Sequence, residues 1–242
     1  GVTVNGEVVT ATEGVYTFVA ATEDQNVVDF VIAVTTEKKD VTVTYTAPNA
    51  TVNGLADSYK YGDTVNFEVM ADEGYNVTGV TANGEVVTAT EGTYTFIANE
   101  MANAIVVTTE KKDVIVTVNE TNATVTLDEE AYKWGDEVTV SVELEEGYEI
   151  KTATVNGEAF VFTDGKYTFA TAGEKYEIVV IAEKKNASVS VTAPNATVNF
   201  DKDAYKYGDT VNFTVTAATG YNVTGVTVNG EVVTATEGVY TF

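Results

Sequence analysis

The chain repeats itself with a period of 73 residues. Residues 41–113 and 114–186 align from end to end without a gap, residues 187–242 match the beginning of the same unit, and residues 1–40 match its end. Self-similarity at a fixed period is typical of tandem structural units, each built in the same way. The sequence therefore predicts two complete modules with a partial module on either side.

The two partial modules share one stretch of sequence. Residues 225–242 are identical, letter for letter, to residues 1–18. This identity favours a longer parent protein that repeats a block of modules, of which this chain covers one block and an overlap. A second interpretation is that the partial modules are complementary, so that residues 19–40 of one copy complete the module 187–242 of another.

Alternating apolar residues predict the strands of each module. Val65, Phe67 and Val69 alternate with polar residues, and the same pattern recurs in the other units. Period-two alternation indicates half-buried strands, and the abundance of Val, Thr, Tyr and Phe agrees with it. No stretch has apolar residues at helical spacing. We expect all-β modules of six or seven strands, arranged either as a two-sheet, immunoglobulin-like sandwich or in a β-grasp-like fold.

Glycine-containing turns separate these strands. Asn83-Gly84 lies between two apolar runs, and its counterparts are Asn5-Gly6, Asn156-Gly157 and Asn229-Gly230. Asn-Gly tolerates positive φ at both central positions and so predicts a type I′ hairpin turn. Gly74-Tyr75 and its equivalents in the next two units predict another turn, closed by an aromatic side chain.

The charge of the chain excludes several classes of partner. There are 37 acidic and 13 basic residues, which gives a formal net charge of −24. Such a surface repels phosphate backbones and anionic lipids, so we expect neither nucleic-acid binding nor membrane insertion of this segment. Cys is absent, which leaves no disulfide and favours an exported prokaryotic protein over a disulfide-stapled animal domain.

No catalytic constellation is recognisable, and we expect no enzyme and no required cofactor. His, Cys and Arg are all absent, and the remaining carboxylates recur with every module instead of forming one special site. Clustered acidic residues in turns could hold calcium, which prefers six to eight oxygen ligands, although turn formation and solubility explain them equally well. These residues are Asp57, Asp63, Asp128, Glu129, Glu130, Asp136, Asp201, Asp203 and Asp209.

A Tyr-Lys-Tyr/Trp-Gly-Asp turn recurs once in each unit and carries paired aromatic residues. The two rings could stack on sugars, or they could be half-buried plugs whose polar ends remain wet. The candidate glycan-stacking residues are Tyr59, Tyr61, Tyr132, Trp134, Tyr205 and Tyr207.

Two covalent modifications are compatible with the composition. Lys, Asn and carboxylates suffice in number for isopeptide cross-links, which also require a specific geometry. Asn-x-Ser/Thr sequons are dense, as Thr-rich repeats generate them by chance, and could carry glycans. The sequon residues are Asn49, Asn76, Asn119, Asn122, Asn186, Asn195, Asn212 and Asn222.

The repeat resembles a known family. The run from Tyr-Lys-Tyr/Trp-Gly-Asp through Gly-Tyr and Asn-Gly-Glu to Tyr-Thr-Phe spans residues 59–96, 132–169 and 205–242, and its second half recurs at 1–18. This pattern resembles the divergent InlB B-repeat family of bacterial surface proteins. The resemblance implies small β-rich modules that act as spacers or adhesive units, and it assigns no function to particular residues.

Three hypotheses follow for the function. The first is a non-enzymatic structural or adhesive segment, a stalk or spacer, of an extracellular prokaryotic surface protein. The second is a subunit of an extracellular filament, joined head to tail by strand exchange between partial modules. The third is a glycan-binding module. The expected partners are neighbouring repeats, further copies of the chain, or a host or environmental glycan or protein.

Overall fold

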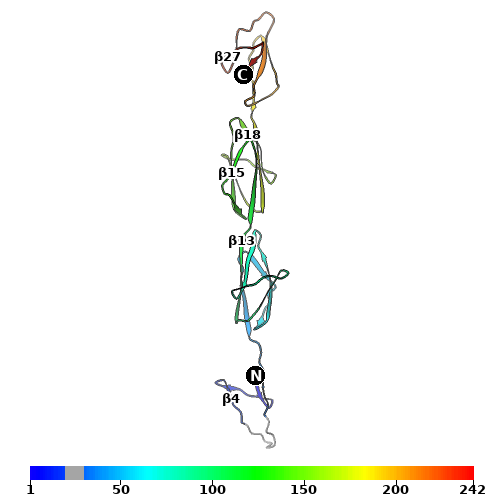
Figure 1. The fold of residues 1–242 in the computed structure, drawn as a ribbon, viewed down its shortest axis with the longest axis vertical. Helices are drawn as coiled ribbons and strands as arrows, with labels where there is room; N and C mark the ends of the chain where they lie inside the picture. The colour runs from blue at the N-terminus through cyan, green and yellow to red at the C-terminus, as the bar shows by residue number, and fades with distance from the viewer. Residues whose placement is uncertain (20–29) are drawn as a thin grey trace. The chain divides into compact units, whose positions relative to one another are not determined.

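The alternating apolar segments form β-strands, as their periodicity predicts. The computed structural model describes residues 1–19 and 30–242, whose strands are drawn as arrows in Figure 1. These two ranges contain no helix, and hence none with the length and apolar character to cross a membrane. The described residues fall into two compact units, Gly1–Glu110 and Lys111–Phe242.

The first complete module has eight strands in two sheets. They are β6 (Asp40–Thr46), β7 (Ala50–Asn53), β8 (Tyr59–Lys60), β9 (Thr64–Ala71), β10 (Tyr75–Ala82), β11 (Glu85–Val86), β12 (Thr93–Ile97) and β13 (Ala102–Lys111). One sheet has five strands in the order β11-β10-β13-β6-β8, and the other has three in the order β12-β9-β7. Of the two topologies that the sequence left open, the two-sheet arrangement is the one observed.

The second complete module repeats this topology strand for strand. Its strands are β14 (Asp113–Thr121), β15 (Thr124–Leu127), β16 (Tyr132–Lys133), β17 (Glu137–Glu143), β18 (Tyr148–Val155), β19 (Glu158–Ala159), β20 (Lys166–Ala170) and β21 (Lys175–Lys184). The sheets are β16-β14-β21-β18-β19 and β15-β17-β20.

Each complete module carries one more strand than the upper expectation of seven. The additional pairing comes from two-residue strands such as β8, in which Lys60 and Tyr59 lie opposite Asp40 and Val41. The sequence predicted only a turn at β8, because a strand of two residues is too short to show alternation of apolar and polar residues. Their strand character comes from the neighbouring strand and not from local alternation.

The first and last strands of each complete module are parallel neighbours. Strand β6 pairs with β13 from Ala102 opposite Thr42 to Val106 opposite Thr46, and β14 pairs with β21 in the same sense over Ile115–Thr121. Parallel strands run in the same direction, so the chain enters a module at one end of the sheet and leaves it at the other.

The core of each module lies between its two sheets. In the first module Val65 and Phe67 from β9 are fully buried against Ile105 and Val107 from β13. Val138, Val140, Ile178 and Val180 occupy the equivalent positions in the second module. The strict alternation seen in the sequence therefore selects the residues that face the opposite sheet.

The C-terminal residues form only part of a module. The strands are β22 (Asn186–Ala187), β23 (Ala196–Phe200), β24 (Tyr205–Lys206), β25 (Asn212–Ala217), β26 (Val226–Val228), β27 (Glu231–Val233) and β28 (Tyr240–Thr241). The three-stranded sheet β23-β25-β28 is present, whereas the five-stranded sheet is represented by two separate pairs, β22-β24 and β26-β27. In this module Tyr221, expected to close its turn as an aromatic plug, is instead 56% exposed.

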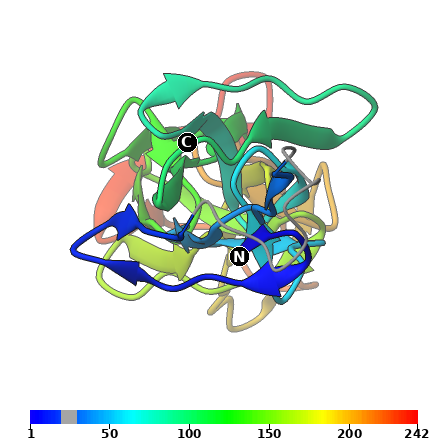
Figure 2. The same cartoon turned by 90° about the horizontal axis from the view of Figure 1, so that it is seen from below.

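The N-terminal residues form two hairpins and one further strand. They are β1 (Val2–Val4), β2 (Glu7–Val8), β3 (Ala11–Thr12), β4 (Val15–Tyr16) and β5 (Ile32–Val34). The hairpin strands are the blue segments of Figures 1 and 2. Strand β1 pairs with β2 and, on its other edge, with β5. Asn5 and Gly6, between β1 and β2, both have positive φ, as the predicted type I′ turn requires.

Candidate functional site

The first aromatic residue of each Tyr-Lys-Tyr/Trp-Gly-Asp turn belongs to a core. Tyr132 and Tyr205 are buried, and Tyr59 is half-buried against the core of the first module. The Tyr132 hydroxyl donates to the Asp128 carboxylate at 2.7 Å and accepts from the backbone N–H of Glu129 at 3.0 Å. Tyr205 donates to Asp201 in the same way. These rings close the end of a module and keep their hydroxyls hydrogen-bonded, as buried tyrosines generally do.

The second aromatic residue of each turn lies at the surface. Tyr61 is 48% exposed, Tyr207 is 43% exposed and Trp134 is half-buried. The backbone N–H of each donates to a carbonyl of the preceding Glu-Lys-Lys linker, as in Tyr207 to Lys185 at 2.9 Å. Because the first ring of each turn is buried or half-buried in a core, the two rings of a turn do not form a shared exposed platform. Each of the three turns thus leaves one ring, Tyr61, Trp134 or Tyr207, at least partly accessible at the surface.

The aspartates of these turns are engaged in hydrogen bonds. Asp63 accepts from Lys38 Nζ at 2.9 Å and from the backbone N–H of Lys60 at 2.8 Å. The Lys38 bond, followed by the Lys60 bond, lowers the pKa of Asp63 below its ordinary value of 3.8. Asp136 repeats this arrangement with Lys111 and Lys133, and its pKa is lowered first by the Lys133 N–H and then by Lys111.

The acidic residues proposed for calcium do not gather into one group. Among the described residues, no three acidic side chains come together in a way that could hold a metal ion. Asp128 and Asp201 accept from tyrosine hydroxyls, and Asp209 accepts from the backbone N–H of Lys206 at 3.2 Å. The remaining candidates are exposed at the surface; they are Asp57, Glu129, Glu130 and Asp203.

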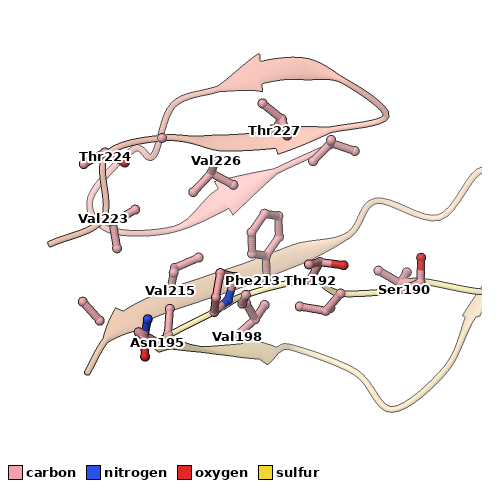
Figure 3. Close-up of a pocket in the computed structure, with 18 of the residues that line it drawn as sticks. Ser190, Thr192, Asn195, Val198, Phe213, Val215, Val223, Thr224, Val226 and Thr227 are labelled. Atoms are coloured by element: carbon pink, nitrogen blue, oxygen red, sulfur yellow. The ribbon is translucent and has the colours of Figure 1, made fainter. Parts of the chain in front are cut away.

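A groove opens in the C-terminal module, with a volume of about 510 Å³. Figure 3 shows its lining, with Val226 on one side, Phe213 and Val215 below it, and Ser190 and Thr192 along the remaining side. In the complete modules the strands β13 and β21 lie in this position. Sequence reasoning did not single out the residues that line this groove.

Comparison with known proteins gives one match. The profile of the family described as the divergent InlB B-repeat domain matches residues 40–111 and 187–242, which together are more than half of the chain. No curated protein matches the chain.

Proposed function

Because this chain belongs to the divergent InlB B-repeat family of bacterial surface-protein repeats, we propose that it is a non-enzymatic stalk segment that carries tension outside the cell. The observation that carries this proposal is the parallel pairing of the first and last strands of each complete module. A stalk that holds a partner away from a cell surface is pulled at its two ends. The force needed to separate the paired first and last strands then decides how well a module resists unfolding under tension.

Tension on the two ends of a module would load this pair in shear. Strand β14 is pulled from its beginning and β21 from its end, in opposite directions along the same ladder. The hydrogen bonds of a parallel ladder are evenly spaced and cross-link the strands along their length, so they would share the load instead of breaking one at a time. In the register of β14 with β21, seven residue pairs take part, from Ile115–Lys175 to Thr121–Ile181.

Ion pairs beside the turn support the same role. Lys38 of the linker meets Asp63, while Asp40, two residues further on, meets Lys60 at 2.7 Å. The two pairs attach the linker to the module that follows it. The high negative charge also keeps a long repetitive protein soluble.

Single-molecule force spectroscopy tests this proposal, because the chain has no Cys and handles can be placed at will. Handles at Asp113→Cys and Lys185→Cys pull β14 against β21 in shear. As a control, handles at Asp113→Cys and Glu174→Cys pull on the adjacent beginnings of the same two strands and unzip them. We expect a clearly higher unfolding force in the first geometry. Equal forces in the two geometries would contradict the stalk proposal.

Glycan binding is a second candidate, favoured by the exposure of one aromatic ring in each module. Tyr61 and Tyr207 are exposed and Trp134 is half-buried, and a sugar could stack on the accessible part of each ring. Trp134 is the only Trp, so its fluorescence reports directly on its own site. A saturable change in Trp134 emission on addition of a polysaccharide would support this function. The variant Trp134→Leu has no Trp to report binding, so its affinity for the polysaccharide is measured by calorimetry. We expect that affinity to fall; an affinity equal to that of the wild type would contradict glycan binding at this ring.

A further inference from the structure

The two complete modules contain Asn-Gly pairs in two different settings. Asn83-Gly84 and Asn156-Gly157 occupy the same repeat position, at the hairpin turn. The pair Asn53-Gly54 has no such counterpart, because the second module has Thr126-Leu127 at that position. It is therefore a feature of the first module and not of the repeat.

An Asn-Gly pair can react with itself. The backbone nitrogen of the glycine attacks Cγ of the asparagine, a C–N bond forms, and the side-chain nitrogen leaves as ammonia with the proton that the backbone nitrogen loses. Water then opens the resulting succinimide ring at either carbonyl carbon, which leaves aspartate or isoaspartate. Glycine favours the attack because it has no Cβ to hinder the approach. The reaction needs an asparagine amide that is free to turn toward the following nitrogen.

The hairpin asparagines are held by the neighbouring strand. Asn83 Oδ1 accepts from the backbone N–H of Ala104 at 2.9 Å, and its Nδ2 donates to Asn103 Oδ1 at 2.9 Å. The Asn156 amide also makes two bonds, both to the backbone of β21, at 2.8 and 3.3 Å. Each amide can turn toward its own glycine only after these bonds break.

Asn53 has no such restraint. It is exposed, and it is the last residue of β7, which is an edge strand of the sheet β12-β9-β7. Within residues 1–19 and 30–242, its side-chain amide makes no hydrogen bond and the backbone N–H of Gly54 donates to no acceptor. Both reacting groups are free, so the side chain turns toward the Gly54 nitrogen without breaking a bond.

We propose that Asn53-Gly54 is a site of spontaneous deamidation, at which the folded first module converts Asn53 to aspartate and isoaspartate while Asn83 and Asn156 persist. The only co-reactant is water, which reaches this exposed position directly. This modification is separate from resistance to tension and does not depend on it.

The product changes the edge of the three-stranded sheet. Asn53 lies opposite Glu68 in the register of β7 with β9, so the new carboxylate faces one that is already present. Like charges directly opposite one another destabilise a pair of strands. Isoaspartate also carries the main chain through its side-chain carbon, which lengthens the chain by one methylene at the end of β7. The first module therefore loosens at β7 as the protein ages.

Peptide mapping by mass spectrometry tests the proposal on the full chain, incubated in its folded state in mildly alkaline buffer. The buffer is made with heavy-oxygen water, so that asparagines that react during the incubation are distinguished from those that react during digestion. We expect Asn53 to be converted about tenfold or more faster than Asn83 or Asn156, because two hydrogen bonds have to break at each of these first. A rate at Asn53 equal to or below theirs would overturn the proposal.

The same incubation in urea separates the effect of the fold from that of the local sequence. No neighbouring strand holds an asparagine in the unfolded chain, so we expect the three rates to converge. If the difference seen in the folded protein persisted in urea, the flanking residues and not the fold would set the rates, and the structural assignment would be overturned.

The variant Asn53→Asp tests the effect of the product on β7. We expect faster amide hydrogen exchange in residues 50–53 than in the wild type, and a return toward the wild-type rate when Glu68→Gln is added. Thr126→Asp is the matched control, because Thr126 lies opposite the uncharged Ser141. Unchanged exchange in Asn53→Asp, or an equal acceleration around residue 126 in the control, would contradict the loosening by Glu68.

Discussion

The ammonium group of Lys38 lies 2.9 Å from a carboxylate oxygen of Asp63. The two residues are 25 positions apart, and Lys111 and Asp136 repeat both the separation and the contact, at 3.1 Å. The other oxygen of Asp63 accepts from the backbone N–H of Lys60. One carboxylate thus joins the linker to the turn and also closes that turn.

Replacing Asp63 by Asn should separate these two contributions. Asn can still accept from the Lys60 N–H but carries no charge for Lys38, so we expect a lower denaturation midpoint of the first module at neutral pH. The lowered pKa of Asp63, caused first by Lys38, means that its stabilisation is present above about pH 3.8 and is lost as the pH falls through the folded-state value. The difference between variant and wild type should therefore shrink in acid.

Hydrogen exchange measured peptide by peptide gives this midpoint for one module at a time. The control is Asp57→Asn, which removes the same charge from an exposed position in the neighbouring loop. A shift of the same size in both variants would indicate a general effect of net charge and not the Lys38–Asp63 pair.

Adjacent residues of β13 should respond very differently to truncation. Ile105 is 0% exposed, and Ile105→Ala leaves a cavity that should cost about 2–5 kcal/mol of the free energy of unfolding. Val106 points to the opposite face and is 42% exposed, so Val106→Ala should cost about 0.5 kcal/mol or less. Urea denaturation of the two variants checks the contrast, and similar costs would show that β13 does not present its alternate residues to the core.

The hydroxyl of Tyr132 should stabilise the second module. Tyr132→Phe removes the bonds to Asp128 and from the Glu129 N–H, and we expect a loss of about 1–3 kcal/mol, since one partner is charged. The matched change Tyr59→Phe removes a hydroxyl that accepts from the Ala56 N–H at 2.7 Å, with no carboxylate partner described. We expect a smaller loss there, and an equal loss would argue against a special contribution from Asp128.

The ionisation of Tyr132 should also make the stability of the second module depend on pH in the alkaline range. Burial, and then the bond to the Asp128 carboxylate, raises the pKa of Tyr132 from 10.0 to about 12. Its contribution is complete below pH 10, declines as the unfolded chain ionises first, and is lost as the pH rises through about 12. Tyr132→Phe should therefore lose less stability than wild type between pH 10 and pH 12 in denaturant titrations, and identical slopes would contradict this assignment.

Local pattern predicted the strands but not their neighbours. The alternation of Val65 and Phe67 identifies the buried face of β9, and Asn5-Gly6 identifies a hairpin, because both depend on residues close in sequence. The parallel pairing of β6 with β13 joins residues about 60 positions apart, as Thr42 with Ala102. Period-two alternation identifies the buried face of a strand but does not identify which other strand pairs with it.

The aromatic turn illustrates the same limit at the level of a site. Tyr59 and Tyr61 look equivalent in the sequence, but Tyr59 belongs to β8 and packs against the core, whereas Tyr61 follows the strand in the turn and is exposed. The Lys38–Asp63 pair could have been suggested by the constant separation of 25 residues, since both residue types recur together. The pairing itself depends on the linker running beside the turn, which only the folded sheet establishes.

Within the second unit, Gly147 lies directly beneath the ring of Tyr207, whose hydroxyl donates to Glu146 at 3.0 Å. A Cβ added at Gly147 would come within 2.0 Å of that ring, whereas a Cβ at Gly220, the equivalent glycine, would meet nothing within 4 Å. Both glycines have positive φ, 83° and 88°, so alanine brings the same backbone strain to both.

We expect Gly147→Ala alone to displace the Tyr207 ring and to remove the effect of Glu146, which raises the pKa of the Tyr207 hydroxyl. Ring chemical shifts of Tyr207, followed by NMR through an alkaline titration, measure this, and equal changes in Gly147→Ala and Gly220→Ala would mean that the ring does not pack on Gly147.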